Sequence, residues 1–181
     1  MTNRTGATGR TGATGRTGAT GASTAALTLD ALRWASLPEL ESIYAGRDPR
    51  SPGAPTSLPA GQFQGHYLRP VASEGARRID NRAIVWAGFV LPRFGVDFTS
   101  SAWWFHHPLF QVGAFAPTIG LSRWRDGEVV QLHYHPSRLP WPIKPLLYDE
   151  VKPLGADLCL GLGGLNRDRG EGDLFFFALA K

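Results

Sequence analysis

The chain has 181 residues, of which 43% are hydrophobic and 19% are charged. This length and composition are typical of one globular domain, which buries enough surface to fold without a metal or a disulfide. The single cysteine, Cys159, excludes an internal disulfide. No run of apolar residues is long enough for a transmembrane helix, so we expect no membrane span.

The net charge of +4 is concentrated near the N-terminus. Arg4, Arg10 and Arg16 precede the first acidic residue, Asp30, so the rest of the chain is close to neutral. Binding to the phosphate backbone of a nucleic acid requires clustered cationic charge. We therefore expect no nucleic-acid partner.

Residues 1–27 form a low-complexity repeat with glycine at every third position from Gly6 to Gly21. The collagen triple helix needs this period, but the run is short and contains no proline. We interpret it as a disordered tail, with a short collagen-like stalk as the alternative. The tail also lacks the apolar stretch of a signal peptide, and with a lone cysteine this predicts a cytoplasmic protein.

Segment 28–60 is predicted to contain one or two short helices, followed by a linker rich in proline and glycine. A capping box begins at Ser36, with Pro38 in the first turn. Apolar residues then recur at helical spacing as far as Tyr44. Gly46 is well placed to end the helix.

From residue 61 to 181 the pattern changes to short strands separated by turns, which predicts a mainly β domain. Such a series favours an antiparallel meander closed into a barrel. Residues 81–91 fit a helix or a strand, and we favour a helix. The strand candidates are 61–68, 94–98, 103–107, 109–115, 119–124, 129–135, 158–162 and 174–180.

Two features predict how these strands are connected and covered. The Asp126-Gly127 pair is a strong signal for a hairpin between two of them. The last strand is apolar on both faces, with Leu174, Phe176 and Ala178 on one and the intervening residues on the other. One face must point into the barrel. The N-terminal helix, or the second subunit of a homodimer, must cover the other.

At this point the sequence resembles a known family, the GxWxG-type proteins, over roughly residues 58–181. These are small calycin-like (lipocalin-like) β-barrels of mostly unassigned function. The resemblance rests on Gly61-x-Phe63-x-Gly65, Trp86-x-Gly88, Leu147-Tyr148-Asp149 and Leu158-Cys159-Leu160-Gly161. It implies a barrel with an internal cavity, in which Phe63 replaces the family's tryptophan and plugs the closed end. It implies no reaction and no catalytic residue.

The barrel interior is the predicted ligand-binding site, because aromatic side chains bring large apolar area. We predict that the ligand is lined by Trp86, Trp103, Phe105, Phe110 and Phe115.

Polar candidates for the same site follow later in the chain. Tyr148 and Asp149 could orient a polar ligand group at the barrel mouth. Alternatively, Asp149 could form a surface ion pair with Lys144 or Lys152. Arg93 is a candidate partner for a ligand carboxylate.

The histidines are weaker candidates. His133 and His135 share a strand face with Gln131, and we expect that face to point to solvent. With His106 or His107 they could bind a metal, and a histidine of that second pair could ligate haem. We favour neither, and expect no metal and no cofactor. Cys159 lies between leucines, which predicts an unreactive core thiol.

These patterns leave three functional hypotheses. The first is binding of a small hydrophobic or amphipathic ligand, such as a lipid, isoprenoid or polyketide-like molecule, inside the barrel. The second is an enzyme of the cyclase or isomerase kind that uses the same lumen. The third is a structural, partner-binding protein whose barrel is filled by its own side chains.

Overall fold

The computed structural model describes residues 26–71, 93–109, 111–142 and 144–181. The predictions for the glycine-repeat tail and for residues 81–91 therefore lie outside the described residues, apart from the end of the tail.

Two short helices begin the described chain, as the sequence predicted: α1 (Leu29–Trp34) and α2 (Leu37–Tyr44). The backbone N–H of Ser36 donates to Glu39 Oε2 at 2.7 Å, which forms the predicted capping box. Gly46 follows with φ +71°, a left-handed conformation that suits glycine at a helix end. Both helices are too short and too polar to cross a membrane, and the described residues contain no other α-helix.

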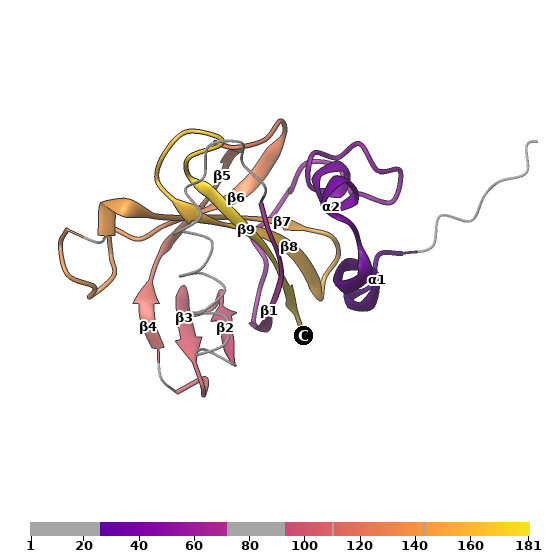
Figure 1. The fold of residues 1–181 in the computed structure, drawn as a ribbon. Helices are drawn as coiled ribbons and strands as arrows, with labels where there is room; N and C mark the ends of the chain where they lie inside the picture. Colours follow the sequence, from indigo (N-terminus) through magenta and orange to yellow (C-terminus); the bar gives the residue numbers. More distant parts are fainter. Residues whose placement is uncertain (1–25, 72–92, 110, 143) are drawn as a thin grey trace, which may run out of the picture.

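Nine antiparallel strands form one sheet in the order β4-β3-β2-β1-β9-β8-β7-β6-β5. The sheet curls until its two edge strands approach each other, and it forms a nearly closed barrel, which confirms the predicted fold class (Figure 1). Phe115 connects β4 to β5, and its N–H donates to the carbonyl of Ser101 at 2.8 Å. The strands are β1 (Gln62–Pro70), β2 (Phe94–Asp97), β3 (Ala102–Phe105), β4 (Gln111–Ala114), β5 (Ala116–Leu121), β6 (Glu128–His133), β7 (Leu147–Pro153), β8 (Leu158–Leu165) and β9 (Asp173–Ala180).

The strands differ from the sequence prediction at several boundaries and in one strand that was missed. β3 ends at Phe105 because His106 takes a left-handed conformation, with φ 64°, that an extended strand cannot contain. β5 ends at Leu121, so Trp124 lies in the loop before Gly127 and the hairpin turn is wider than the Asp-Gly pair predicted. β7 was not predicted as a strand, although its first residues belong to the motif that carried the family resemblance.

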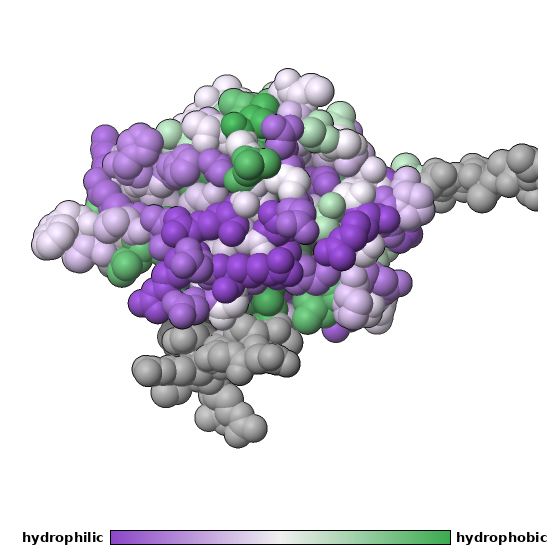
Figure 2. Space-filling model, turned by 90° about the horizontal axis from the view of Figure 1, so that it is seen from above, coloured by the Kyte–Doolittle hydropathy of each residue, from purple (hydrophilic) through white to green (hydrophobic). Residues whose placement is uncertain are grey.

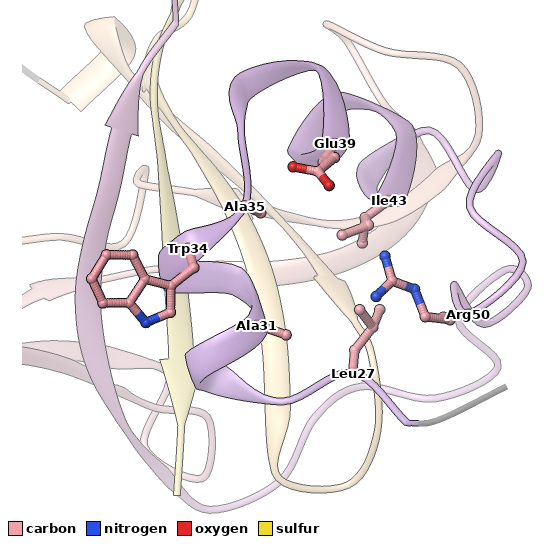
Figure 3. A pocket seen from close by; sticks show the side chains of 7 residues that line it. All are labelled: Leu27, Ala31, Trp34, Ala35, Glu39, Ile43 and Arg50. Atoms are coloured by element: carbon pink, nitrogen blue, oxygen red, sulfur yellow. The ribbon is translucent and has the colours of Figure 1, made fainter.

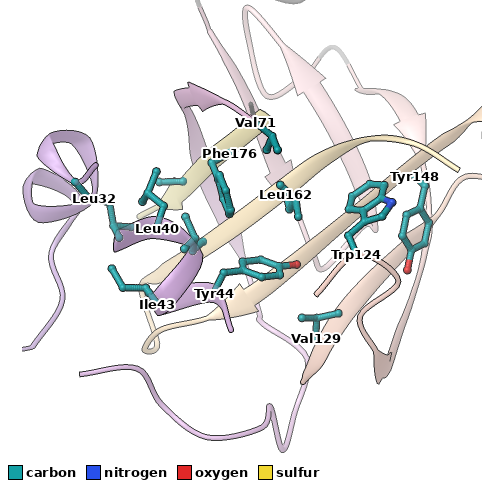
Figure 4. Packing of buried hydrophobic residues seen from close by; sticks show 13 residues of the cluster. Leu32, Leu40, Ile43, Tyr44, Val71, Trp124, Val129, Tyr148, Leu162 and Phe176 are labelled. Carbon is teal, nitrogen blue, oxygen red and sulfur yellow. The ribbon is translucent and has the colours of Figure 1, made fainter. Parts of the chain in front are cut away.

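The two faces of the sheet bury two different cores. The outer core lies between the helices and β7, β8 and β9, where the ring of Tyr44 packs edge-on against that of Phe176 with centroids 5.8 Å apart (Figure 4). The inner core fills the barrel and includes Phe177 from the opposite face of the same strand. The N-terminal helices thus cover the outer apolar face of β9. The sequence had left this covering open between the N-terminal helix and a second subunit.

Glycines on the inner face make room for aromatic rings. A Cβ at Gly65 would overlap the ring of Phe94, and a Cβ at Gly161 would overlap the ring of Phe177. Gly65, the second glycine of the Gly61-x-Phe63-x-Gly65 motif, therefore has a packing role, because the Phe94 ring occupies the space that a side chain would need.

Candidate binding site

One end of the barrel interior is closed by buried aromatic rings. Phe63 is 1% exposed and packs edge-on against Phe98, with ring centroids 5.7 Å apart. Lys181 Nζ lies 5.0 Å from the centre of the Phe63 ring and seals this end from outside. Phe63 is thus a core residue.

The opposite end, which we call the open end, is lined by side chains that remain partly exposed. The register of the sheet brings them together: Phe94 pairs with Phe105 across β2 and β3, and the ring of Phe175 lies 5.7 Å from that of Tyr67. The open end comprises Tyr67, Phe94, Phe105, Leu147 and Phe175. It is the partly exposed portion of the inner apolar surface.

A hydrogen-bonded pair, formed by the hydroxyl of Tyr134 and the carboxylate of Asp149, lies beside the open end. Tyr134 follows β6, and its hydroxyl donates to Asp149 Oδ2 on β7. Asp149 Oδ1 accepts from the backbone N–H of Gly164 at 3.2 Å. Burial raises the pKa of Asp149 to about 6, although both hydrogen bonds oppose that rise. Burial and the neighbouring Asp149 carboxylate raise the pKa of Tyr134 well above its ordinary value.

Two hydrogen-bond donors on the inner face of the barrel have no partner within the part of the chain that the structure describes. Trp103 is 7% exposed, yet its indole Nε1 makes no hydrogen bond, and neither does the hydroxyl of Tyr67. Trp103 and Tyr134 both lie beside Gly113. A Cβ built on Gly113 would be 3.7 Å from an atom of each side chain. The indole N–H lowers the pKa of Tyr134 slightly, but it does not reach hydrogen-bonding geometry with the hydroxyl. A buried donor without an acceptor is uncommon and costs free energy.

The structure places the predicted site residues in three groups. Trp103, Phe105 and Phe115 face the barrel interior, as does Asp149. Arg93 is exposed, and within the described ranges it forms no ion pair. Trp86 and Phe110 lie outside the described residues.

Tyr148 is a correction, because it belongs to the outer core and not to the barrel mouth. Its ring packs edge-on against Trp124, with centroids 5.1 Å apart. Successive strand residues point to opposite faces, so Tyr148 and Asp149 cannot both face the interior. Asp149 also forms no ion pair with Lys144 or Lys152 in the structure; Lys152 is buried and donates to the carbonyl of Tyr44 at 3.0 Å.

Five site residues escaped the sequence prediction: Tyr67, Phe94, Tyr134, Leu147 and Phe175. Strand alternation carried a signal that Tyr134 and Phe175 point inward, since Tyr134 lies between His133 and His135, and Phe175 lies between Leu174 and Phe176. Tyr67 and Phe94 needed the pairing register, because only that places them at one end of the barrel.

The outer face of the sheet contains a buried polar network beneath α2. The carboxylate of Glu150 is fully buried. Its four donors are Tyr44 Oη at 3.1 Å, Tyr148 Oη at 2.9 Å, Ser122 Oγ at 2.5 Å and the N–H of Arg123 at 2.5 Å. Three of these bonds join α2 and the β5–β6 loop to β7, and the bond from Tyr148 lies within β7, so this carboxylate has a structural role.

A second ionic cluster lies on the same outer side. The side chain of Arg125 is 3% exposed and binds both oxygens of Glu41, from α2, through its guanidinium group. It also donates to Asp173 Oδ2 at 2.6 Å, at the start of β9. Arg125 thereby fixes the helix against the sheet.

The histidines follow the expectation that they face away from the interior. His133 Nε2 lies 3.2 Å from both Thr118 Oγ1 and Gln131 Oε1, on the outer face, and His135 is exposed. His106 and His107 are exposed and lie beyond the end of β3. Within the described residues, no three metal-ligating side chains come together.

A shallow hollow of about 190 Å³ lies on the outer surface between the helices and the loop that follows them (Figure 3). Its two charged residues already have partners, because Glu39 caps α2 and Arg50 pairs with Asp48 at 2.7 Å. Trp34, at one edge, is 85% exposed. Figure 2 shows that hydrophilic side chains dominate one face of the molecule and that hydrophobic groups form separate patches there. The hollow is therefore lined mainly by apolar side chains, and both of its charged side chains are already paired.

The comparisons with known proteins name no function. No family model and no curated protein matches the chain. Among solved structures, the chain is similar to a protein from Thermomonospora curvata, with a TM-score of 0.43 and 14% identity. That likeness covers 71% of this chain and 78% of the other.

Proposed function

We propose that the chain binds a small hydrophobic or amphipathic molecule, such as a lipid, isoprenoid or polyketide-like compound, at the open end of its barrel. The observation that carries this proposal is the buried N–H of Trp103, which has no acceptor among the described residues. An unsatisfied buried donor costs about 1–3 kcal/mol, which an acceptor on a bound molecule would offset. The partly exposed aromatic rings around it supply the apolar surface that such a site needs.

The family resemblance points the same way, because GxWxG-type barrels imply an internal cavity. We include membership of that family in the proposal. Small-molecule sites combine an apolar lining with a few polar groups that fix orientation. Trp103, Tyr134 and Asp149 are such groups here.

Native mass spectrometry of protein purified without denaturation, followed by organic extraction, tests whether a molecule is carried along. In parallel, a titration with Nile red, a neutral apolar fluorophore, tests the site directly. Saturable binding should be lost in Gly113→Leu, because the new side chain would project between Trp103 and Tyr134. It should persist in Trp34→Ala, which alters only the outer hollow. Circular dichroism checks that both variants fold.

The proposal fails if the wild-type protein shows no saturable binding and no extracted molecule. It also fails if Trp34→Ala loses Nile red while Gly113→Leu retains it, because the outer hollow would then be the site.

Asp149 supports a second candidate function, an isomerase that moves a proton within the bound molecule. A carboxyl group with a pKa of about 6 beside an apolar site has the proton affinity that a general base needs near neutral pH. Incubation of the protein with 2-decanone in deuterated water tests this function. Deuterium incorporation that occurs with the wild type and is absent with Asp149→Asn would support it, and equal incorporation with both would exclude Asp149 as the base.

A further inference from the structure

We propose that the open end selects a neutral oxygen-bearing molecule, an alcohol or a carbonyl compound, and rejects a carboxylate such as a fatty-acid anion. This inference rests on the proposed function and adds the chemical class of the ligand's polar group.

The free hydrogen-bonding groups define what the ligand must offer. Trp103 Nε1 and Tyr67 Oη are donors without partners in the described ranges, so the ligand must present an acceptor. The hydroxyl hydrogen of Tyr134 is already given to Asp149, so the Tyr134 oxygen can only accept. An alcohol suits both kinds of group, because its oxygen can accept from a donor such as the indole and its hydrogen can be donated to an acceptor such as Tyr134. A carbonyl group satisfies the donors alone.

The charge at this site disfavours an anion. Asp149 places a carboxylate on the inner face, where its only other polar contact is the N–H of Gly164. Glu150, the next residue, adds negative charge from the outer side of the same strand. A ligand carboxylate near Trp103 would approach these charges in surroundings where water screens poorly, and like charges there repel strongly.

Three of the described cations lie elsewhere. Lys152 is bound beneath α2, and Arg125 is held by its two carboxylate partners on the outer side. Lys181 lies at the closed end, where it pairs with Asp157 at 3.1 Å. Arg69, two residues after Tyr67, donates from Nε to the carbonyl of Ala35 at 2.6 Å. Arg93 is exposed and directly precedes Phe94 of the open end. It therefore enters the test as the group that would favour the opposite outcome.

The experiment compares decan-1-ol with decanoate, two probes that share one alkyl chain and differ in charge. Each displaces Nile red from the wild type, Asp149→Asn and Arg93→Gln at about pH 7.5, where decanoate is ionised. Nitrogen-15 NMR follows the indole N–H of Trp103, assigned with Trp103→Phe. We expect decan-1-ol to bind at least about tenfold more tightly than decanoate and to shift the Trp103 signal. In Asp149→Asn that preference should fall to within about threefold, and in Arg93→Gln it should not change.

The inference is overturned if decanoate binds the wild type as tightly as decan-1-ol. It is also overturned if Asp149→Asn leaves the preference intact, or if Arg93→Gln abolishes decanoate binding selectively. In these cases Nile red still binds, so the proposed function survives. If Nile red itself does not bind, the proposed function has failed instead.

Discussion

Tyr134 and Asp149 meet inside the barrel, where the tyrosine hydroxyl at the end of β6 donates a hydrogen bond to the carboxylate on β7. The pair lies between the fully buried inner core and the partly exposed rings of the open end. A charged carboxylate in such surroundings is costly for stability, and its retention is easier to understand at a binding site than in a purely structural core.

The charge on Asp149 should make stability depend on pH. The folded-state pKa of about 6 lies above the ordinary value of 3.8. The protonated Asp149 therefore contributes fully to the stability of the fold below about pH 4, and this contribution is lost as the pH rises through 6. Asp149→Asn should therefore raise the free energy of unfolding by up to about 3 kcal/mol at neutral pH and by little at pH 4. Urea denaturation at the two pH values measures this difference.

The control for that measurement is Asp157→Asn, which removes a carboxylate that is 72% exposed. It should change stability little at either pH. An equal gain for Asp149→Asn at both pH values would show that the carboxylate is not strained by burial.

Loss of Arg125 should destabilise the protein strongly, because it would leave Asp173 buried without its cation. We expect Arg125→Gln to lower the free energy of unfolding by about 3–5 kcal/mol in urea denaturation. Arg33→Gln removes an exposed pair with Asp30 and should have little effect. Similar losses for the two variants would show that the buried cluster does not hold α2 to the sheet.

Gly161 should tolerate no side chain while Phe177 occupies its space. Gly161→Ala forces a Cβ into that ring, and we expect it to cost about 1–3 kcal/mol of stability. Adding Phe177→Leu should recover part of the loss, so a double-mutant cycle should show a favourable coupling energy. Gly155→Ala is the matched control, because nothing lies within 4 Å of its Cβ position. Additive losses in the cycle would contradict this packing.

Cys159 should be inert in the native state. The thiol is buried, and burial raises its pKa to about 12. Ellman's reagent at about pH 8 should therefore label it only after denaturation, because the native thiol is neither ionised nor reachable. Rapid labelling of the folded protein would place this residue at an accessible surface instead.

Local sequence patterns predicted much of the fold, because the forces involved act over a few residues. The capping box at Ser36, the helix end at Gly46 and the two-sided apolar pattern of β9 all appear in the structure. The end of β3 was wrong because the left-handed conformation of His106 has no signal in the residue type alone. The strand from Leu147 was missed because the charged residues Glu150 and Lys152, which are buried, made the segment look like an exposed polar one.

The sequence by itself determined that this is one mainly β domain with a closed sheet, helices at its N-terminus and a cysteine in its core. Alternation and turn residues are sufficient for that, since each is a local property of the chain. Only the tertiary structure decided that Tyr148 faces outward, that Asp149 meets Tyr134, and that Trp103 buries a donor without an acceptor. Those facts depend on the register between strands that are distant in sequence, and register is set by packing of the whole barrel and not by any single segment.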